Sequence, residues 1–353
     1  MYNFIANALI VWYEENKRDL PWRNTHDPYF IWISEIILQQ TRVNQGLPYF
    51  HNFVEQFPDV KALATAPEEK VLRAWQGLGY YSRARNLHAA AKFIYYNLEG
   101  NFPKSFSSLL NLKGVGEYTA AAIASFAYKE KVPVLDGNVM RVLSRLFDLQ
   151  DDIKLPATRK KMLTLAGEII PGDKPDLFNQ AIMEFGALHC TPVNPACSAC
   201  VLNVECEAFK NKTQNQRPVK SQKVTVKERY FNYIVFKQEN GVYMKQRKGG
   251  DIWQGLFDFY LYETDQLLEK QDNLIELLGY RLGNEPFIVG NESRLYKHIL
   301  THQKLWVKFW IVDIKNLPYH FINQNNLILL SPVKISEAPK PILIEKFLKS
   351  TFY

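Results

Sequence analysis

Long hydrophobic runs are missing from this chain of 353 residues. Apolar stretches such as residues 31–38 are interrupted by polar side chains, here Ser34 and Glu35, long before the ~18 apolar residues that a transmembrane helix needs. The first residues contain neither a basic segment nor a small-residue cleavage site, so they do not resemble an export signal. We therefore expect no membrane association and a cytoplasmic location.

A strong excess of one charge is also missing, since 43 basic residues face 36 acidic ones. Residues 212–226 are the exception, because they contain four basic and no acidic residues. Such a segment is compatible with a polyanionic partner, and also with a simple solvated linker. With 47% hydrophobic and 14% aromatic residues, the remainder can build sizeable cores, and the length favours two domains over one.

The hydrophobic period changes along the chain. Up to about residue 209 it is helical, as in Val139, Val142, Leu143 and Leu146, which predicts an all-α body. After residue 226 it alternates, which predicts strands. The predicted strands cover residues 230–237, 242–247, 257–262 and 305–314, and two helices are expected at about 265–278 and 340–350. We predict an all-α domain (residues 1–211), a basic linker (212–226) and an α/β domain (227–353).

All four cysteines lie within residues 190–206, at Cys190, Cys197, Cys200 and Cys206. In a chain without an export signal, the spacing C-x6-C-x2-C-x5-C favours a metal site over a disulfide framework. Four thiolates suit zinc and a [4Fe-4S] cluster equally well in ligand number. The spacing alone leaves these two metal centres open.

A short glycine motif lies between two predicted helices, at residues 112–116. Gly114 and Gly116 can form a tight hairpin whose exposed N–H groups bind an anion at the start of the next helix. If the anion is a DNA phosphate, the contact grips DNA without choosing a base. An ordinary glycine-capped corner between helices is the alternative.

Two carboxylates stand in apolar surroundings, Glu35 in IWISEIILQQT and Asp136 in VPVLDGNVM. Burial of Glu35 would raise its pKa and keep a proton available near neutral pH. Asp136 directly before a helix is also a common N-cap, and Glu35 could lie at a surface edge. A protonated acid together with an ionised carboxylate is the pair that cleavage of a glycosidic bond requires.

Five motifs in order resemble the helix-hairpin-helix base-excision DNA glycosylases that carry a [4Fe-4S] cluster. They are SEIILQQTRV, GLGYYSRARNLHAA, LKGVGEYTAAAI, VLDGNVMRVLSRL and the cysteine run. The adenine DNA glycosylases of the MutY type are the most similar branch, and they remove adenine mispaired with 8-oxoguanine. The resemblance implies a [4Fe-4S] cluster in place of zinc, a monomer acting at the bacterial nucleoid, and duplex DNA with adenine opposite 8-oxoguanine or guanine as the partner.

The resemblance also implies roles for single residues. Glu35 would protonate N7 of adenine and Asp136 would stabilise the sugar cation, while Tyr118 and Asn138 orient Asp136 and the attacking water. The residue after the hairpin is Tyr118, where relatives resembling endonuclease III have a lysine that attacks the sugar. A tyrosine lacks that amine, so we expect a monofunctional glycosylase without lyase activity.

Further residues are implied in substrate and DNA binding. Trp22, Arg23 and Gln180 would line the adenine pocket, and Gln40 and Tyr80 would enter the duplex. The other implied DNA contacts are Arg18, Leu20, Thr41, Gly114 and Gly116. Trp22 and Tyr80 have a simpler interpretation as core aromatics, and Gln40, Gln180 and the two arginines as helix-surface residues.

The second domain resembles the Nudix-like domain of the same family, which inspects the base opposite adenine. It has no G-x5-E-x7-R-E-x2-E-E string, so hydrolysis of oxidised nucleotides is disfavoured. The family's phenylalanine-serine-histidine loop is reduced here to Leu300-Thr301-His302, in which Thr301 and His302 keep hydrogen-bonding groups. Two rival functions remain: an endonuclease III-like glycosylase/lyase for oxidised pyrimidines, and a noncatalytic DNA-binding module with an iron-sulfur cluster.

Overall fold

The computed structural model describes residues 2–221 and 226–352. The chain divides into two compact units, Met1–Thr65 with Asn86–Gln222, and Ala66–Arg85 with Lys223–Tyr353. The second unit therefore includes a segment from the helical half of the sequence. Residues 222–225, with Lys223 of the predicted linker, lie outside the described residues.

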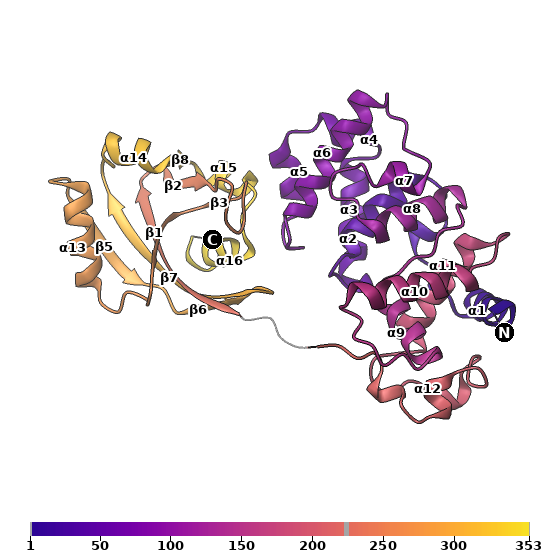
Figure 1. Cartoon of the computed structure of the whole chain (residues 1–353). Coiled ribbons are helices and arrows are strands. Elements are labelled where there is room, and N and C mark those ends of the chain that lie inside the picture. Colours follow the sequence, from indigo (N-terminus) through magenta and orange to yellow (C-terminus); the bar gives the residue numbers. More distant parts are fainter. Residues whose placement is uncertain (1, 222–225, 353) are drawn as a thin grey trace. The chain divides into compact units, whose positions relative to one another are not determined.

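The first unit is helical throughout its described residues, which confirms the predicted all-α body (Figure 1). Its helices are α1 (Tyr2–Asn16), α2 (Pro28–Leu38), α3 (Val43–Gln56), α4 (Val60–Thr65), most of α6 (Ser82–Asn97), α7 (Phe106–Leu109), α8 (Glu117–Tyr128), α9 (Gly137–Leu146), α10 (Pro156–Ile169), α11 (Pro175–Leu188) and α12 (Glu207–Lys210). Three short 3₁₀ turns, η1 (Pro21–Arg23), η2 (Cys197–Ala199) and η3 (Gln214–Gln216), complete it. Within the described residues, none of the chain's helices has the length and apolarity to cross a bilayer.

Helices α2 and α8 form the centre of this unit. In α2 every residue from Ile31 to Ile37 is buried, and in α8 every residue from Thr119 to Phe126 is buried. A helix that is apolar on all sides is stable only when other helices surround it. Because α2 and α8 pack against each other, a polar side chain on one is brought against a polar side chain on the other.

The first part of the predicted linker packs on the helical unit. Arg217 is buried and forms a 2.8 Å ion pair with Asp148. Thr213 and Asn211 donate hydrogen bonds of 2.7 and 3.0 Å to the same carboxylate. This part of residues 212–226 is therefore packed on the helical unit, whereas the basic composition had been compatible with a polyanionic partner or a solvated linker.

The second unit contains one mixed sheet with helices on both faces. The alternating pattern predicted its strands and an α/β domain, but not this arrangement. Its strands are β1 (Lys227–Gln238), β2 (Gly241–Gln246), β3 (Phe257–Asp258), β4 (Tyr260–Thr264), β5 (Phe287–Glu292), β6 (Tyr296–Ile299), β7 (Gln303–Ile314) and β8 (Ile328–Leu330). Its helices are α5 (Glu68–Ala74), α13 (Gln271–Leu282), α14 (Tyr319–Asn325), α15 (Pro332–Glu337) and α16 (Ile342–Thr351). The long strands β1 and β7 pair in parallel along their length, and the other pairs are antiparallel.

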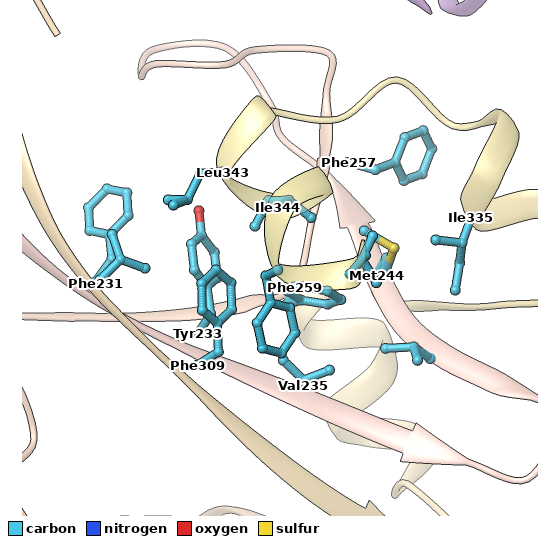
Figure 2. Close-up of a cluster of buried hydrophobic side chains, with 14 of the residues drawn as sticks. Phe231, Tyr233, Val235, Met244, Phe257, Phe259, Phe309, Ile335, Leu343 and Ile344 are labelled. Atoms are coloured by element: carbon cyan, nitrogen blue, oxygen red, sulfur yellow. The ribbon is translucent and has the colours of Figure 1, made fainter. Parts of the chain in front are cut away.

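Alternate residues of β1 supply two separate cores, because successive side chains of a strand point to opposite faces. Phe231, Tyr233 and Val235 pack with α16 on one face, and Ile234 and Phe236 pack with α13 on the other. Figure 2 shows the first of these cores, with Leu343 and Ile344 of α16 among the aromatic side chains. Leu300, directly before the predicted recognition residues Thr301 and His302, packs against the first of these cores.

Two predictions about the second unit were wrong in detail, and several of its elements were not predicted. The helix expected at residues 265–278 begins only at Gln271, because the buried Asn232 side chain accepts a 3.1 Å hydrogen bond from the N–H of Leu268 and holds that segment as a loop. The strand expected at residues 257–262 is divided between β3 and β4. Strands β5, β6 and β8 and helices α14 and α15 were not predicted.

Candidate active site

A cleft of about 1040 Å³ in the first unit brings together most of the predicted site residues. The predicted catalytic residues in its lining are Glu35, Tyr118, Asp136 and Asn138. The predicted binding residues in its lining are Arg18, Leu20, Trp22, Arg23, Gln40, Thr41, Gly116 and Gln180. The cleft therefore unites residues from both ends of the helical sequence.

Glu35 lies near the end of α2, and its carboxyl group is buried in the wall of the cleft. Burial raises the pKa of Glu35 to about 7, and the neighbouring charge of Asp136 adds to this effect. The hydrogen bond from Tyr118 and the charge of Arg23 act in the opposite direction. At neutral pH a carboxyl group with this pKa is protonated in a large fraction of the molecules, and in these it can donate its proton.

Tyr118 lies in the first turn of α8, and its phenol donates a 2.5 Å hydrogen bond to Oε2 of Glu35. Burial, followed by the charges of Glu35 and Asp136, raises the pKa of this phenol well above its usual value. Tyr118 is therefore neutral at physiological pH and acts as a hydrogen-bond donor.

Asp136 is the N-cap of α9, as the simpler interpretation of the sequence had it. Its Oδ1 accepts a 2.7 Å hydrogen bond from the N–H of Val139, and its Oδ2 accepts a 2.8 Å hydrogen bond from Nδ2 of Asn138. Burial raises the pKa of Asp136, whereas these hydrogen bonds and the charge of Arg141 lower it. The Asp136 carboxylate thus caps α9 and also lines the cleft.

Arg141 was missed by the sequence analysis, and it connects Asn138 to two other segments. Its Nη2 donates to Oδ1 of Asn138 at 2.9 Å and to the carbonyl of Gly186 at 2.6 Å, and its Nε donates to the carbonyl of Cys190 at 2.8 Å. Glycine at position 186 allows α11 to lie close to Asn138 of α9, because a Cβ on residue 186 would be only 2.8 Å from Cβ of Asn138. The amide that holds Asp136 is thereby fixed to the cysteine loop.

Glu184 is a second residue that sequence analysis missed. It lies one helical turn after Gln180 in α11, lines the same cleft, and accepts hydrogen bonds from both Arg18 and Arg23. The signal that could have indicated it is a carboxylate within the apolar run FNQAIMEFGAL, four residues from a predicted pocket residue.

The remaining predicted DNA contacts do not line this cleft. Gly114 has a φ of +80°, and a Cβ there would lie 2.6 Å from Cβ of Asn86, so the hairpin requires glycine. In the second unit, Thr301 and His302 are exposed in the turn between β6 and β7, and the hydroxyl of Thr301 is hydrogen-bonded to the phenol of Tyr80.

Tyr80 and the cleft residue Gln40 share an unusual backbone conformation. Their φ values are 49° and 57°, and such strained backbone often marks functional positions.

The four cysteines line one small pocket together with Arg145 and Leu202. None forms a disulfide, and Nη1 of Arg145 donates to Sγ of Cys190 at 3.3 Å. Within the described residues, no group of three or more His, Cys, Asp or Glu side chains is arranged to hold one metal ion. Four unpaired thiols around a common space form the donor set that an iron-sulfur cluster uses, so the residues fit such a cluster.

Comparison with known proteins identifies two domains. Residues 33–169 match the HhH-GPD superfamily of base excision DNA repair proteins, and residues 232–350 match the NUDIX domain. Among solved structures, a thermostable thymine-DNA glycosylase covers 60% of this chain and 97% of its own, with a TM-score of 0.55 and 28% identity. The predicted fold class, a helix-hairpin-helix glycosylase domain with a Nudix-like domain, is therefore confirmed.

Two curated relatives narrow the family. The adenine DNA glycosylase of Homo sapiens is 39% identical over 218 residues, which are 59% of this chain and 40% of that protein. The adenine DNA glycosylase of Buchnera aphidicola subsp. Acyrthosiphon pisum is 36% identical over 360 residues, which cover 100% of both chains. This likeness along the full length shows that the chain belongs to the adenine DNA glycosylase family of base excision repair enzymes.

Proposed function

We propose that the cleft is the active site, where adenine flipped out of duplex DNA is removed by hydrolysis, with Glu35 as the general acid. The observation that carries this proposal is the buried Glu35 carboxyl group with its pKa near 7, hydrogen-bonded to Tyr118 inside a cleft that also contains Asp136. A base inside the helix stack cannot reach such a cleft, so extrusion of the adenine precedes the chemistry.

In this mechanism the bond between C1′ and N9 breaks as Glu35 gives its proton to N7, so that adenine leaves as a neutral molecule. The positive charge that develops on the sugar is stabilised by the carboxylate of Asp136. Asn138 holds Oδ2 of Asp136 and is itself held by Arg141. Water then adds to C1′ and gives up a proton to the Glu35 carboxylate, which restores the acid and leaves an abasic site.

A monofunctional reaction is supported by the composition of the cleft. Among the described residues that line it, none is a lysine, and the position after the hairpin is occupied by the neutral phenol of Tyr118. Without an amine near C1′, no Schiff base with the sugar forms and the DNA strand is not cleaved.

We assign the choice of the opposite base to the second unit. The chain would act as a monomer at the nucleoid on duplexes with adenine opposite 8-oxoguanine or guanine. The exposed Thr301 and His302 offer hydrogen bonds to a lesion edge, and Tyr80 lies beside Thr301 in the same unit. Along the sequence we keep a glycosylase domain of residues 1–211, a linker of 212–226 and a recognition domain of 227–353, and residues 66–85 with Tyr80 are the part of the glycosylase domain that clusters with the second unit.

Cys190, Cys197, Cys200 and Cys206 would hold a [4Fe-4S] cluster, whose contribution is to fold the loop of residues 190–206. Arg145 supports this loop by donating to the carbonyls of Thr191 and Pro192 at 2.7 and 3.2 Å. Arg141 fixes the carbonyl of Cys190 in the same region. The protein's own hydrogen bonds thus connect the folding of this loop to the shape of the cleft.

Product analysis on three duplexes tests the proposal. The duplexes contain adenine opposite 8-oxoguanine, adenine opposite guanine, or an oxidised pyrimidine. We expect free adenine and an abasic strand from the first two, no base release from the third, and no covalent adduct after borohydride treatment. Adduct formation with an oxidised pyrimidine would instead support the glycosylase/lyase, and binding without any base release would support the noncatalytic module.

A further inference from the structure

Glu184 is a carboxylate in the cleft to which the proposed mechanism assigns no role. Its side chain is only 1% exposed. It lies on the same face of α11 as Gln180, four residues earlier, and both residues line the cleft that contains Glu35. A buried carboxylate in an enzyme cleft requires partners that repay the loss of its hydration.

Those partners are five N–H groups from two arginines. Oε1 of Glu184 accepts from the backbone N–H of Arg18 at 3.1 Å, from Nε of Arg18 at 2.8 Å and from Nη1 of Arg23 at 2.8 Å. Oε2 accepts from Nη2 of Arg18 and from Nη2 of Arg23, each at 2.6 Å. Both guanidinium groups are therefore bound in two-point geometry, which fixes their planes as well as their positions.

The same group extends to Gln180 through Tyr13. The guanidinium of Arg23 lies 5.6 Å from the ring centroid of Tyr13, and the phenol of Tyr13 donates a 2.9 Å hydrogen bond to Oε1 of Gln180. Glu184 thus directly holds Arg23 of the predicted adenine pocket and the predicted DNA contact Arg18. Gln180 of the pocket is connected to this group through Tyr13.

We propose that Glu184 is a positioning residue for adenine excision, which orients Arg18 and Arg23 at the base pocket and offsets their positive charge beside Glu35. The inference rests on the proposed role of Glu35 as the acid. It goes beyond that role because it explains how the acid can keep its proton although the positive charge of Arg23 lowers its pKa.

The charges around Glu35 support this inference. The groups that act on the Glu35 carboxyl are Tyr118 from α8, Asp136 before α9 and Arg23 from η1, and Arg23 lowers its pKa. The other charged residues that line the cleft are Arg18, Arg42, Glu117, Arg141, Arg159 and Glu184. Although burial alone would raise the pKa of Glu184, its hydrogen bonds with Arg23 and Arg18 lower it to about 2, so its negative charge is constant through the working pH range.

The test compares the pH dependence of single-turnover adenine release in the full chain and in variants at position 184. In E184Q the positive charge of Arg23 is no longer offset, so Glu35 loses its proton at lower pH. We expect the rate to fall about 3- to 10-fold on the alkaline side of the profile and to approach the parent rate on the acidic side. E184D keeps the charge and should restore the midpoint of the profile.

The variant R23Q tests the sign of the effect. Removal of the positive charge should move the alkaline decline to higher pH, whatever the loss in overall rate. E14Q removes one exposed carboxylate from α1 and should leave the profile unchanged. If E184Q does not fold, as a melting curve would reveal, R23Q tests the charge effect by itself.

An equal loss of rate at every pH in E184Q would indicate only a structural role and would overturn the inference, as would an unshifted profile in R23Q. The variant E35Q, measured in parallel, separates this failure from failure of the mechanism. If E35Q is inactive but the E184Q and R23Q profiles do not move, only the inference fails. If E35Q reacts at the parent rate, the assignment of the acid and the inference both fail.

Discussion

The phenol of Tyr118 donates a 2.5 Å hydrogen bond to the carboxyl group of Glu35, a residue 83 positions away in the sequence. The contact exists because α2 and α8 are both buried on all sides and pack against each other. The hydrogen bond fixes the position of the acid and lowers its pKa, whereas burial raises that pKa to about 7. In the proposed reaction the same tyrosine also stands where the resemblance places the lysine of lyases, and it has no amine to attack the sugar.

The buried acid should make the stability of the fold depend on pH. The pKa of Glu35 is raised by burial from 4.5 to about 7 in the folded chain. A group whose folded pKa is raised contributes stability below its unfolded pKa and loses it as the pH rises through the folded value. Relative to E35Q, the free energy of unfolding of the parent should therefore fall by roughly 2 to 3 kcal/mol across that window.

Denaturant unfolding at several pH values checks this prediction. The variant E14Q, in which the lost carboxylate is exposed, should follow the parent curve. Parallel curves for the parent and E35Q would mean that folding does not shift the pKa of Glu35, so that it would be ionised at neutral pH, against its proposed role as an acid.

Asp136→Asn should abolish most adenine release and leave folding almost intact. Asparagine caps helices about as well as aspartate, so the hydrogen bond from Val139 can be kept while the negative charge is lost. The matched control is Asp59→Asn, because Asp59 accepts a 2.7 Å hydrogen bond from the N–H of Ala62 at the start of α4. Unchanged melting in both variants with activity lost only at Asp136 would separate catalysis from capping, whereas full activity in Asp136→Asn would leave capping as its only role.

The cysteine pocket should contain iron and sulfide. Anaerobically purified protein should be brown and hold about four iron atoms and four sulfides per chain. Cys200→Ser should reduce folding or DNA binding, because the loop of residues 190–206 depends on the cluster. Metal analysis that finds zinc as the main metal would contradict the assignment.

The turn at Thr301 and His302 should control discrimination between opposite bases. The double variant T301A/H302A should still excise adenine but lose part of its preference for 8-oxoguanine over guanine, since each lost hydrogen bond costs about 0.5 to 1.5 kcal/mol. The measurement is the ratio of binding and excision rates for the two partners at fixed salt. Its control is H320A/T351A, which changes two exposed residues of the same unit; an equal ratio in both double variants would assign recognition to the helical unit.

Local patterns predicted the parts of the site that depend on helix identity. Glu35 is flanked by isoleucines and Asp136 stands before a helix, so burial of the first and capping by the second could be expected from neighbouring residues. The same is true of the glycine hairpin, where Gly114 has the positive φ that the motif requires. The four cysteines were close enough in sequence to predict a shared pocket.

Contacts between distant segments could not be predicted in this way. Glu184 meets Arg18 and Arg23 across more than 160 positions, and Arg141 meets the loop of Cys190 through a helix crossing that Gly186 allows. The late start of α13 likewise depends on Asn232 in a distant strand. These features arise from tertiary packing between distant segments, and the hydrophobic periodicity of a segment carries no information about such contacts.

Protonation of the departing adenine by Glu35 is the step on which the proposed mechanism depends. Its most direct test is the single-turnover rate of adenine release from a duplex with adenine opposite 8-oxoguanine, measured with saturating enzyme for the parent and E35Q. We expect E35Q to release adenine ~10²- to 10⁴-fold more slowly than the parent, or more slowly still. Duplex binding should be largely unchanged, because glutamine has nearly the same shape as glutamate. A rate near that of the parent would contradict the proposed role of Glu35.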